Sequence, residues 1–222
     1  MVRHGTANPK IAGSTPVTTF ALIFQLDRIV GYEPADASSN LARGVKIYGR
    51  SGDMRFISPT YGDFNTTEDV TKKIVERMNM KPDSEWVIAI GTDSQNKKDR
   101  TKFCSAILLL EKGNGGIYFY STHSDPRLQG VQHRMLKEAE TSIHIGHEVI
   151  KSLENMYLKE ELEDIDYDVK FEIHCDLGVN GKSESAIKAA IGWITAEFGD
   201  RVTARIKPDS PAASYVADRY TK

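Results

Sequence analysis

The 222-residue sequence has few cysteines, little net charge and no long apolar run, and each shortage excludes a class of protein. Its two cysteines, Cys104 and Cys175, lie in separate apolar segments without CxxC or Cys/His spacing, which argues against a disulfide scaffold or a thiolate zinc site. A net charge of −2 excludes a surface coated in basic charge, although a local basic groove is still compatible with it. No apolar run approaches the ~20 residues that span a bilayer. We therefore expect a cytoplasmic globular protein.

A phosphate-binding glycine loop is also missing. The glycine-rich stretch at residues 113–116 lacks the Lys-Ser/Thr ending of such a loop, and it is typical of a hairpin turn instead. No glycine-rich turn follows the first strand-like run either, which argues against an ATP-handling enzyme.

The first 53 residues differ from the rest of the chain. Two turn-rich stretches, at residues 7–16 and 34–40, surround a single short apolar run. Residues 4–18 resemble reading frames opened through transfer-RNA genes, and the codons of residues 49–51 can spell a ribosome-binding sequence just before Met54. We expect residues 1–53 to be a poorly ordered extension or a wrongly assigned start, and residues 54–222 to form one domain.

From Met54 onward, hydrophobic periodicity predicts an alternation of strands and helices. The expected strands are residues 85–92, 102–111, 117–121, 169–175 and 201–207, and the expected helices are residues 66–80, 131–158, 183–198 and 210–220. After the first helix the order is β-β-β-α-β-α-β-α, which predicts an α/β protein with a mixed five-stranded sheet flanked by helices. The fourth and fifth strands follow helices and should run parallel to the first.

Three of these strands lead into an aspartate: Asp93 and Asp176 follow their strands directly, and Asp209 follows Pro208. Ligands of open α/β sheets gather beyond the carboxyl ends of the parallel strands. A buried carboxylate beside like charges is costly unless a cation gathers it. Carboxylate oxygens suit Mg²⁺ or Mn²⁺, so the pattern predicts a divalent-metal site. The helix at residues 131–158 offers Glu138 or Glu140 as a fourth ligand, and periodicity does not choose between them.

Several motifs together resemble the bacterial YkuK family, which has the ribonuclease H-like fold. The matching stretches are residues 90–95, 138–142, 173–178, 180–183, 207–210, 216–218 and 220–222. The resemblance covers about residues 54–222. It implies a nuclease-like protein in which Glu138 is the helix carboxylate and joins Asp93 and Asp176.

The choice of the fourth acidic ligand, Asp209 or Asp218, depends on the expected geometry of the final helix. Asp209 opens the final helix, whereas Asp218 lies about 13 Å further along it at ~1.5 Å per residue. We therefore expect Asp209 to be catalytic and Asp218 to be a structural partner of a nearby base.

The expected function is hydrolysis of phosphodiester bonds in RNA or DNA by Asp93, Glu138, Asp176 and Asp209 with two metal ions. The expected nucleic-acid contacts are Ser94, Gln95, Asn180, Lys182 and Lys207, with a basic edge at Lys97, Lys98, Arg100 and Lys102. The alternative is a non-catalytic nucleic-acid-binding or scaffold protein that keeps the fold. His174, two residues before Asp176, is expected to be a satisfied core histidine rather than a proton carrier.

Overall fold

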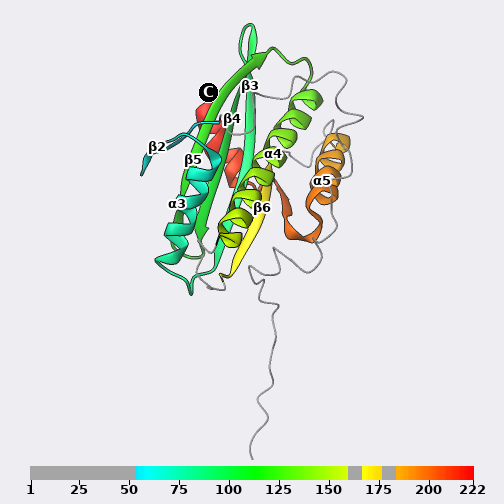
Figure 1. The fold of residues 1–222 in the computed structure, drawn as a ribbon. Helices are drawn as coiled ribbons and strands as arrows, with labels where there is room; N and C mark the ends of the chain where they lie inside the picture. Colours follow the sequence, from blue (N-terminus) through cyan, green and yellow to red (C-terminus); the bar gives the residue numbers. More distant parts are fainter. Residues whose placement is uncertain (1–53, 160–166, 177–183) are drawn as a thin grey trace, which may run out of the picture.

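The computed structural model describes residues 54–159, 167–176 and 184–222 (Figure 1). The expected extension at residues 1–53 lies outside these ranges, as do Asn180 and Lys182.

One mixed sheet of seven strands forms the centre of the molecule, in the order β2-β1-β5-β4-β3-β6-β7. The five expected strands are β3 (Trp86–Asn96), β4 (Arg100–Glu111), β5 (Gly115–Pro126), β6 (Val169–Cys175) and β7 (Thr203–Ile206). β3, β4 and β5 are antiparallel neighbours, while β6 runs parallel to both β3 and β7. The predicted α/β class and strand directions are confirmed.

Two further strands enlarge the sheet beyond the expected five. β1 (Phe56–Ser58) and β2 (Gly62–Phe64) form a hairpin, and Ile57 of β1 pairs with Tyr120 of β5. Each has only three residues, which is too short for an alternating pattern to reveal.

Three helices cover one face of the sheet. They are α3 (Thr67–Asn79), α4 (Val131–Leu158) and α5 (Glu184–Phe198), and α4 crosses the sheet in Figure 1. α3 begins with a capping box, in which the Thr66 side chain accepts from the Asp69 N–H and the Asp69 side chain accepts from the Thr66 N–H. The main hydrophobic core lies between these helices and the sheet. None of the described helices is both long and apolar enough to cross a membrane.

The C-terminal segment covers the other face, behind the sheet in Figure 1. The expected helix at residues 210–220 is instead a π-helix, η3 (Ala212–Ala217), followed by the short α6 (Asp218–Thr221). Small residues of η3 pack on small residues of β3 and β4 in a second core. Gly91 of β3 permits this approach, because a Cβ there would lie 2.6 Å from the backbone nitrogen of Ala213.

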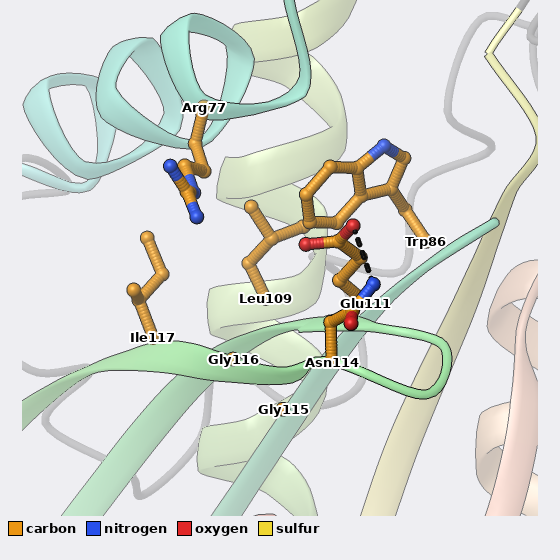
Figure 2. A pocket seen from close by; sticks show the side chains of 8 residues that line it. All are labelled: Arg77, Trp86, Leu109, Glu111, Asn114, Gly115, Gly116 and Ile117. Carbon is orange, nitrogen blue, oxygen red and sulfur yellow. Dashed lines mark hydrogen bonds between the residues drawn. The ribbon is translucent and has the colours of Figure 1, made fainter. Parts of the chain in front are cut away.

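A small pocket of ≈ 80 Å³ lies at the end of the sheet where β3 begins and β4 ends. Figure 2 shows Arg77 of α3 facing Leu109, Ile117 and Glu111. Glu111 is 6% exposed. Its carboxylate accepts hydrogen bonds from Lys81, Ser84 and Asn114. The bonds from Lys81 lower the pKa of Glu111 below its ordinary value, against the opposing effect of burial.

The Glu111→Gln variant is expected to lose stability at neutral pH and to match the wild type in acid. A carboxyl whose pKa is lower in the folded protein stabilises it above the unfolded pKa, and this contribution disappears as the pH falls through the folded pKa. Urea unfolding at about pH 7 and about pH 3 measures the difference. The exposed pair Glu184–Lys188 supplies the control, since Glu184→Gln should change little at either pH. A Glu111→Gln deficit that persists unchanged in acid would contradict this origin.

Candidate active site

Asp93 does not end its strand, contrary to the sequence expectation. β3 continues past it to Asn96, because β4 keeps pairing along the whole length, with Asp93 opposite Cys104 and Asn96 opposite Thr101. The pairing with β6 does stop at this level. Asp93 therefore lies where the parallel part of the sheet ends, but within an antiparallel hairpin that extends beyond it.

Asp93 and Asp176 lie side by side where the parallel pairing of β3 and β6 ends. The last parallel pair of β3 and β6 is Thr92 with Cys175, and the next residue on each chain is the aspartate. Adjacent strands lie about 4.8 Å apart. The predicted neighbourhood of these strands is confirmed, and Asp93 lies on the face covered by the C-terminal segment, whose Thr221 it contacts.

Asp93 is 9% exposed and is held by the C-terminal segment. Its Oδ2 accepts a hydrogen bond of 2.7 Å from the hydroxyl of Thr221, the penultimate residue of the sequence. Burial raises the pKa of Asp93, and the nearby charges of Asp176 and Asp218 raise it further, while the bond from Thr221 opposes the shift. The Asp93 carboxylate is thus desolvated among like charges.

Glu138, not Glu140, turns toward the sheet. Glu138 is 8% exposed, and its Oε1 accepts a 2.5 Å hydrogen bond from Ser94 of β3. Burial raises the pKa of Glu138 to about 8, with added contributions from the charges of Asp93 and Asp176, against the bond from Ser94 and the charge of Arg134. Glu140 is paired with Lys137 at 2.6 Å instead. The two glutamates that periodicity left open are therefore separated by the fold.

Lys207 is bound to the carboxylate cluster. Cys175 pairs with Ile206, so the next residue of each strand, Asp176 and Lys207, are also neighbours. The Lys207 ammonium lies 2.6 Å from Asp176 Oδ1, a buried oxygen that has no partner in hydrogen-bond geometry among the described residues. This contact raises the pKa of Lys207, and the charges of Asp176, Asp93 and Asp218 add to it. Lys207 was expected to contact a phosphate, and it contacts a carboxylate here.

The fold brings Asp218, rather than Asp209, toward Asp93. Asp209 is exposed, and its backbone N–H closes a turn onto Ile206. Asp218 is near enough to raise the pKa of both Asp93 and Lys207. It also pairs with Lys222 at 2.6 Å, which agrees with the expected basic partner. From the sequence, Asp218 was expected to lie too far along the final helix to reach the site. That expectation did not include the packing of η3 across β3, which brings Asp218 back toward Asp93.

His174 is a satisfied core histidine, as expected. It is 2% exposed, and its Nδ1 accepts a hydrogen bond from the backbone N–H of Ala212 at the start of η3. Nε2, 2.9 Å from Glu172, must then carry the proton of the neutral ring. His174 therefore links β6 to η3 and has no free nitrogen for catalysis.

The expected nucleic-acid contacts differ in how accessible they are to a ligand. Ser94 points to Glu138 and is buried, so it is not open to a ligand, whereas Gln95 is half-buried on the opposite face of the strand. Asn180 and Lys182 lie outside the described residues. Sequence reasoning missed Thr221, whose only sequence signal is its place in the C-terminal motif at residues 220–222.

The donor set is suited to a divalent cation in its chemistry. Its members supply carboxylate oxygens, the ligand atoms that hard divalent cations prefer. Burial and neighbouring like charges raise the pKa values of Asp93 and Glu138, and a bound cation would offset both effects. Within residues 54–159, 167–176 and 184–222, no three His, Cys, Asp or Glu side chains stand close enough to hold one ion as they are. In this arrangement the ammonium of Lys207 supplies the positive charge beside Asp176.

Comparison with known proteins identifies relatives of the chain. The sequence model of the family described as "Ribonuclease H-like" matches residues 69–222. "Uncharacterized protein YkuK" of Bacillus subtilis (strain 168) is 32% identical over 162 residues, which are 71% of this chain and 91% of that protein. The crystal structure of RNase H1 from the halophilic archaeon Halobacterium salinarum NRC-1 matches 60% of this chain and 96% of its own at 13% identity, with a TM-score of 0.29.

Proposed function

Because the chain belongs to the ribonuclease H-like family, we propose that it is a divalent-metal-dependent nuclease that hydrolyses phosphodiester bonds in RNA or DNA. The resemblance to the YkuK relatives seen in the sequence motifs is confirmed, and so is the ribonuclease H-like class of the fold. The reaction is our inference from the site.

One observation carries the proposal: carboxylates from different elements converge at one edge of the sheet although their burial there is unfavourable. Asp93 comes from β3, Asp176 follows β6 and Glu138 comes from α4 on the other face. Burial raises the pKa of Asp93 and Glu138, so both carry an electrostatic cost in the ion-free protein. Carboxyls with perturbed pKa values cluster at functional sites.

Asp93, Glu138 and Asp176 would hold Mg²⁺ or Mn²⁺, and we propose Asp218 in place of Asp209 as the fourth acidic group. If bound there, a pair of such ions would supply Lewis-acid chemistry: activation of a water and stabilisation of the leaving oxygen. The chain's other residues orient the ligands. Thr221 holds one oxygen of Asp93, and Ser94 holds one oxygen of Glu138.

The position of Ser94 is itself supported from α4. Arg134 donates a 2.7 Å hydrogen bond to the Ser94 carbonyl, which ties the start of α4 to β3 one helical turn before Glu138. Hydrogen bonds from neighbouring residues therefore fix the orientations of the Asp93 and Glu138 carboxylates. Such supporting bonds are typical of the residues around a metal site.

The proposal is tested with purified wild-type protein and fluorescent RNA, DNA and RNA–DNA hybrid oligonucleotides. Cleavage should require Mg²⁺ or Mn²⁺ and stop in EDTA. Calorimetric titration with Mn²⁺ in the absence of nucleic acid should show binding. Nucleic-acid binding that is independent of metal, with no cleavage of any of the three substrates, would instead favour the non-catalytic alternative.

The choice between the two C-terminal acids has its own test. Asp218→Asn is expected to weaken Mn²⁺ binding and cleavage by about 10-fold or more, the scale on which groups around a metal site act. Asp209→Asn, a change of the same charge on an exposed turn, should have little effect on either quantity. Calorimetry and initial cleavage rates measure both variants side by side. A larger loss in Asp209→Asn would restore the expectation drawn from the sequence.

A further inference from the structure

The hairpin beyond Asp93 places cationic side chains on the same face of the sheet as the carboxylates. Side chains alternate between faces along a strand, so Asp93 and Gln95 of β3 share one face. Lys97 is the first residue beyond β3, and its ammonium donates a hydrogen bond to Gln95 Oε1, which places it beside Gln95 on that face. Residues directly opposite each other on antiparallel strands also share a face. Lys102 is opposite Gln95, and Arg100 is opposite Lys97, whose backbone N–H bonds to the Arg100 carbonyl at 2.8 Å.

The other face of this hairpin is braced. The Asn96 side chain donates to the Leu128 carbonyl at 3.1 Å, and the Leu128 N–H donates to Thr101 at 2.9 Å. Arg127 donates to the carbonyls of Lys97 and Lys98 at 2.8 and 3.0 Å, which holds the turn itself. Bonds from outside the hairpin to both its strands and its turn make it a rigid support, unlike a freely moving surface loop.

The face that carries Asp93 is open beyond the C-terminal segment. Lys97 and Arg100 are exposed, and Lys102 and Gln95 are half-buried. On β5, Thr122 and Ser124 lie opposite Cys104 and Lys102, and both are exposed on the same face. We call this surface the hairpin face; its residues are Gln95, Lys97, Arg100, Lys102, Thr122 and Ser124.

We propose that the hairpin face binds the phosphodiester backbone of a nucleic-acid strand and leads it to the carboxylates, an inference that rests on the proposed nuclease function. Its three cations complement the charge of phosphates, and its amide and hydroxyls are donors to phosphate oxygens. The hairpin projects at the top of Figure 1.

The length of the hairpin face fits a backbone contact. Lys97 is four residues beyond Asp93, about 13 Å at ~3.3 Å per strand residue. Successive phosphates of one strand in a duplex advance ~3.4 Å along the helix axis, so this distance spans about four of them. Binding through phosphates alone is independent of base sequence.

The test is the salt dependence of binding by the double variant Lys97→Glu/Arg100→Glu. Its affinity for a fluorescent RNA–DNA hybrid and for single strands of about 20 nucleotides should fall about tenfold or more at low salt. The slope of log K against log salt should decrease by about 2, because each of the two cations would neutralise one phosphate in the wild type. The neutral variant Lys97→Gln/Arg100→Gln should show a smaller decrease in affinity. Circular dichroism and thermal melting verify that each variant is folded.

The matched control is Lys151→Glu/Lys170→Glu, which makes the same change in net charge at exposed positions away from the carboxylates. It should keep wild-type affinity and slope. Equal decreases in the control and in Lys97→Glu/Arg100→Glu would overturn the inference, because net charge alone would then explain them.

The remaining outcomes separate this inference from the proposed function. Wild-type protein that cleaves, with a Lys97→Glu/Arg100→Glu variant that binds equally well, overturns the role of the hairpin face and leaves the nuclease proposal intact. Wild-type protein that binds no RNA, DNA or hybrid overturns both. Binding that depends on the hairpin face without any metal-dependent cleavage supports the hairpin face and overturns the nuclease reaction.

Discussion

Asp93→Asn is expected to abolish metal-stimulated cleavage, with a loss of at least about 100-fold, the upper range found when even an outer partner of a metal site is removed. Asp93 is nearly buried, and burial together with the charges of Asp176 and Asp218 raises its pKa. Asparagine can still accept the hydrogen bond from Thr221, so the local structure should persist. Initial cleavage rates in Mg²⁺ and in Mn²⁺ measure the loss.

The same substitution should leave nucleic-acid binding near the wild-type level and raise, rather than lower, the melting temperature in EDTA. Asparagine carries no charge to desolvate and no repulsion toward Asp176. Asp200→Asn, at an exposed position in the 3₁₀ turn η2 (Gly199–Arg201), is the control and should change neither activity nor melting. An Asp93→Asn protein that cleaves as well as the wild type when purified in the same way would place the activity elsewhere or in a contaminant.

Gly91→Val is expected to lower the free energy of unfolding by about 1–3 kcal/mol, the usual cost of forcing an added side chain into a packed interior. A Cβ at this position would lie 2.6 Å from Ala213 N and 3.0 Å from Ala212 C, both backbone atoms that cannot rotate away. The π-helix η3 must therefore move off β3. Urea unfolding measures the loss, and hydrogen exchange of residues 212–221 should show the C-terminal segment opening first.

The functional consequence of Gly91→Val should follow from this movement. Thr221 and Asp218 are carried by the same segment, so Asp93 should lose its hydrogen bond and its charged neighbour together. Mn²⁺ affinity should fall as well as stability. Gly192→Ala is the control, because no atom lies within 4 Å of an added Cβ there and alanine is favoured by roughly 0.5–1 kcal/mol within a helix. Normal Mn²⁺ affinity in Gly91→Val would show that the C-terminal segment does not shape the site.

Local periodicity predicted the elements that carry a strong repeating pattern. The helix at residues 131–158 and the strand at residues 169–175 were predicted with the bounds that α4 and β6 have. Both elements bury apolar residues that recur at a regular spacing, and this spacing can be recognised within the sequence of the element itself. The continuation of β3 beyond Asp93 was not predicted, because Ser94, Gln95 and Asn96 are polar and are held in the strand by pairing with β4.

The sequence by itself determined the α/β order of elements, the family resemblance and the placing of Asp93 and Asp176 at one edge, since the directions of β3 and β6 follow from the order and connections of the elements. Only the tertiary structure decided which groups surround them. It brought Asp218 rather than Asp209 near Asp93 and placed Lys207 on Asp176. It also turned Glu138 toward β3, the glutamate that the family resemblance had indicated and that periodicity alone had not distinguished from Glu140. The packing of α4 orients Glu138, the packing of η3 positions Asp218, and the pairing of β7 with β6 positions Lys207. Contacts between segments distant in the chain leave no periodic signal in either segment.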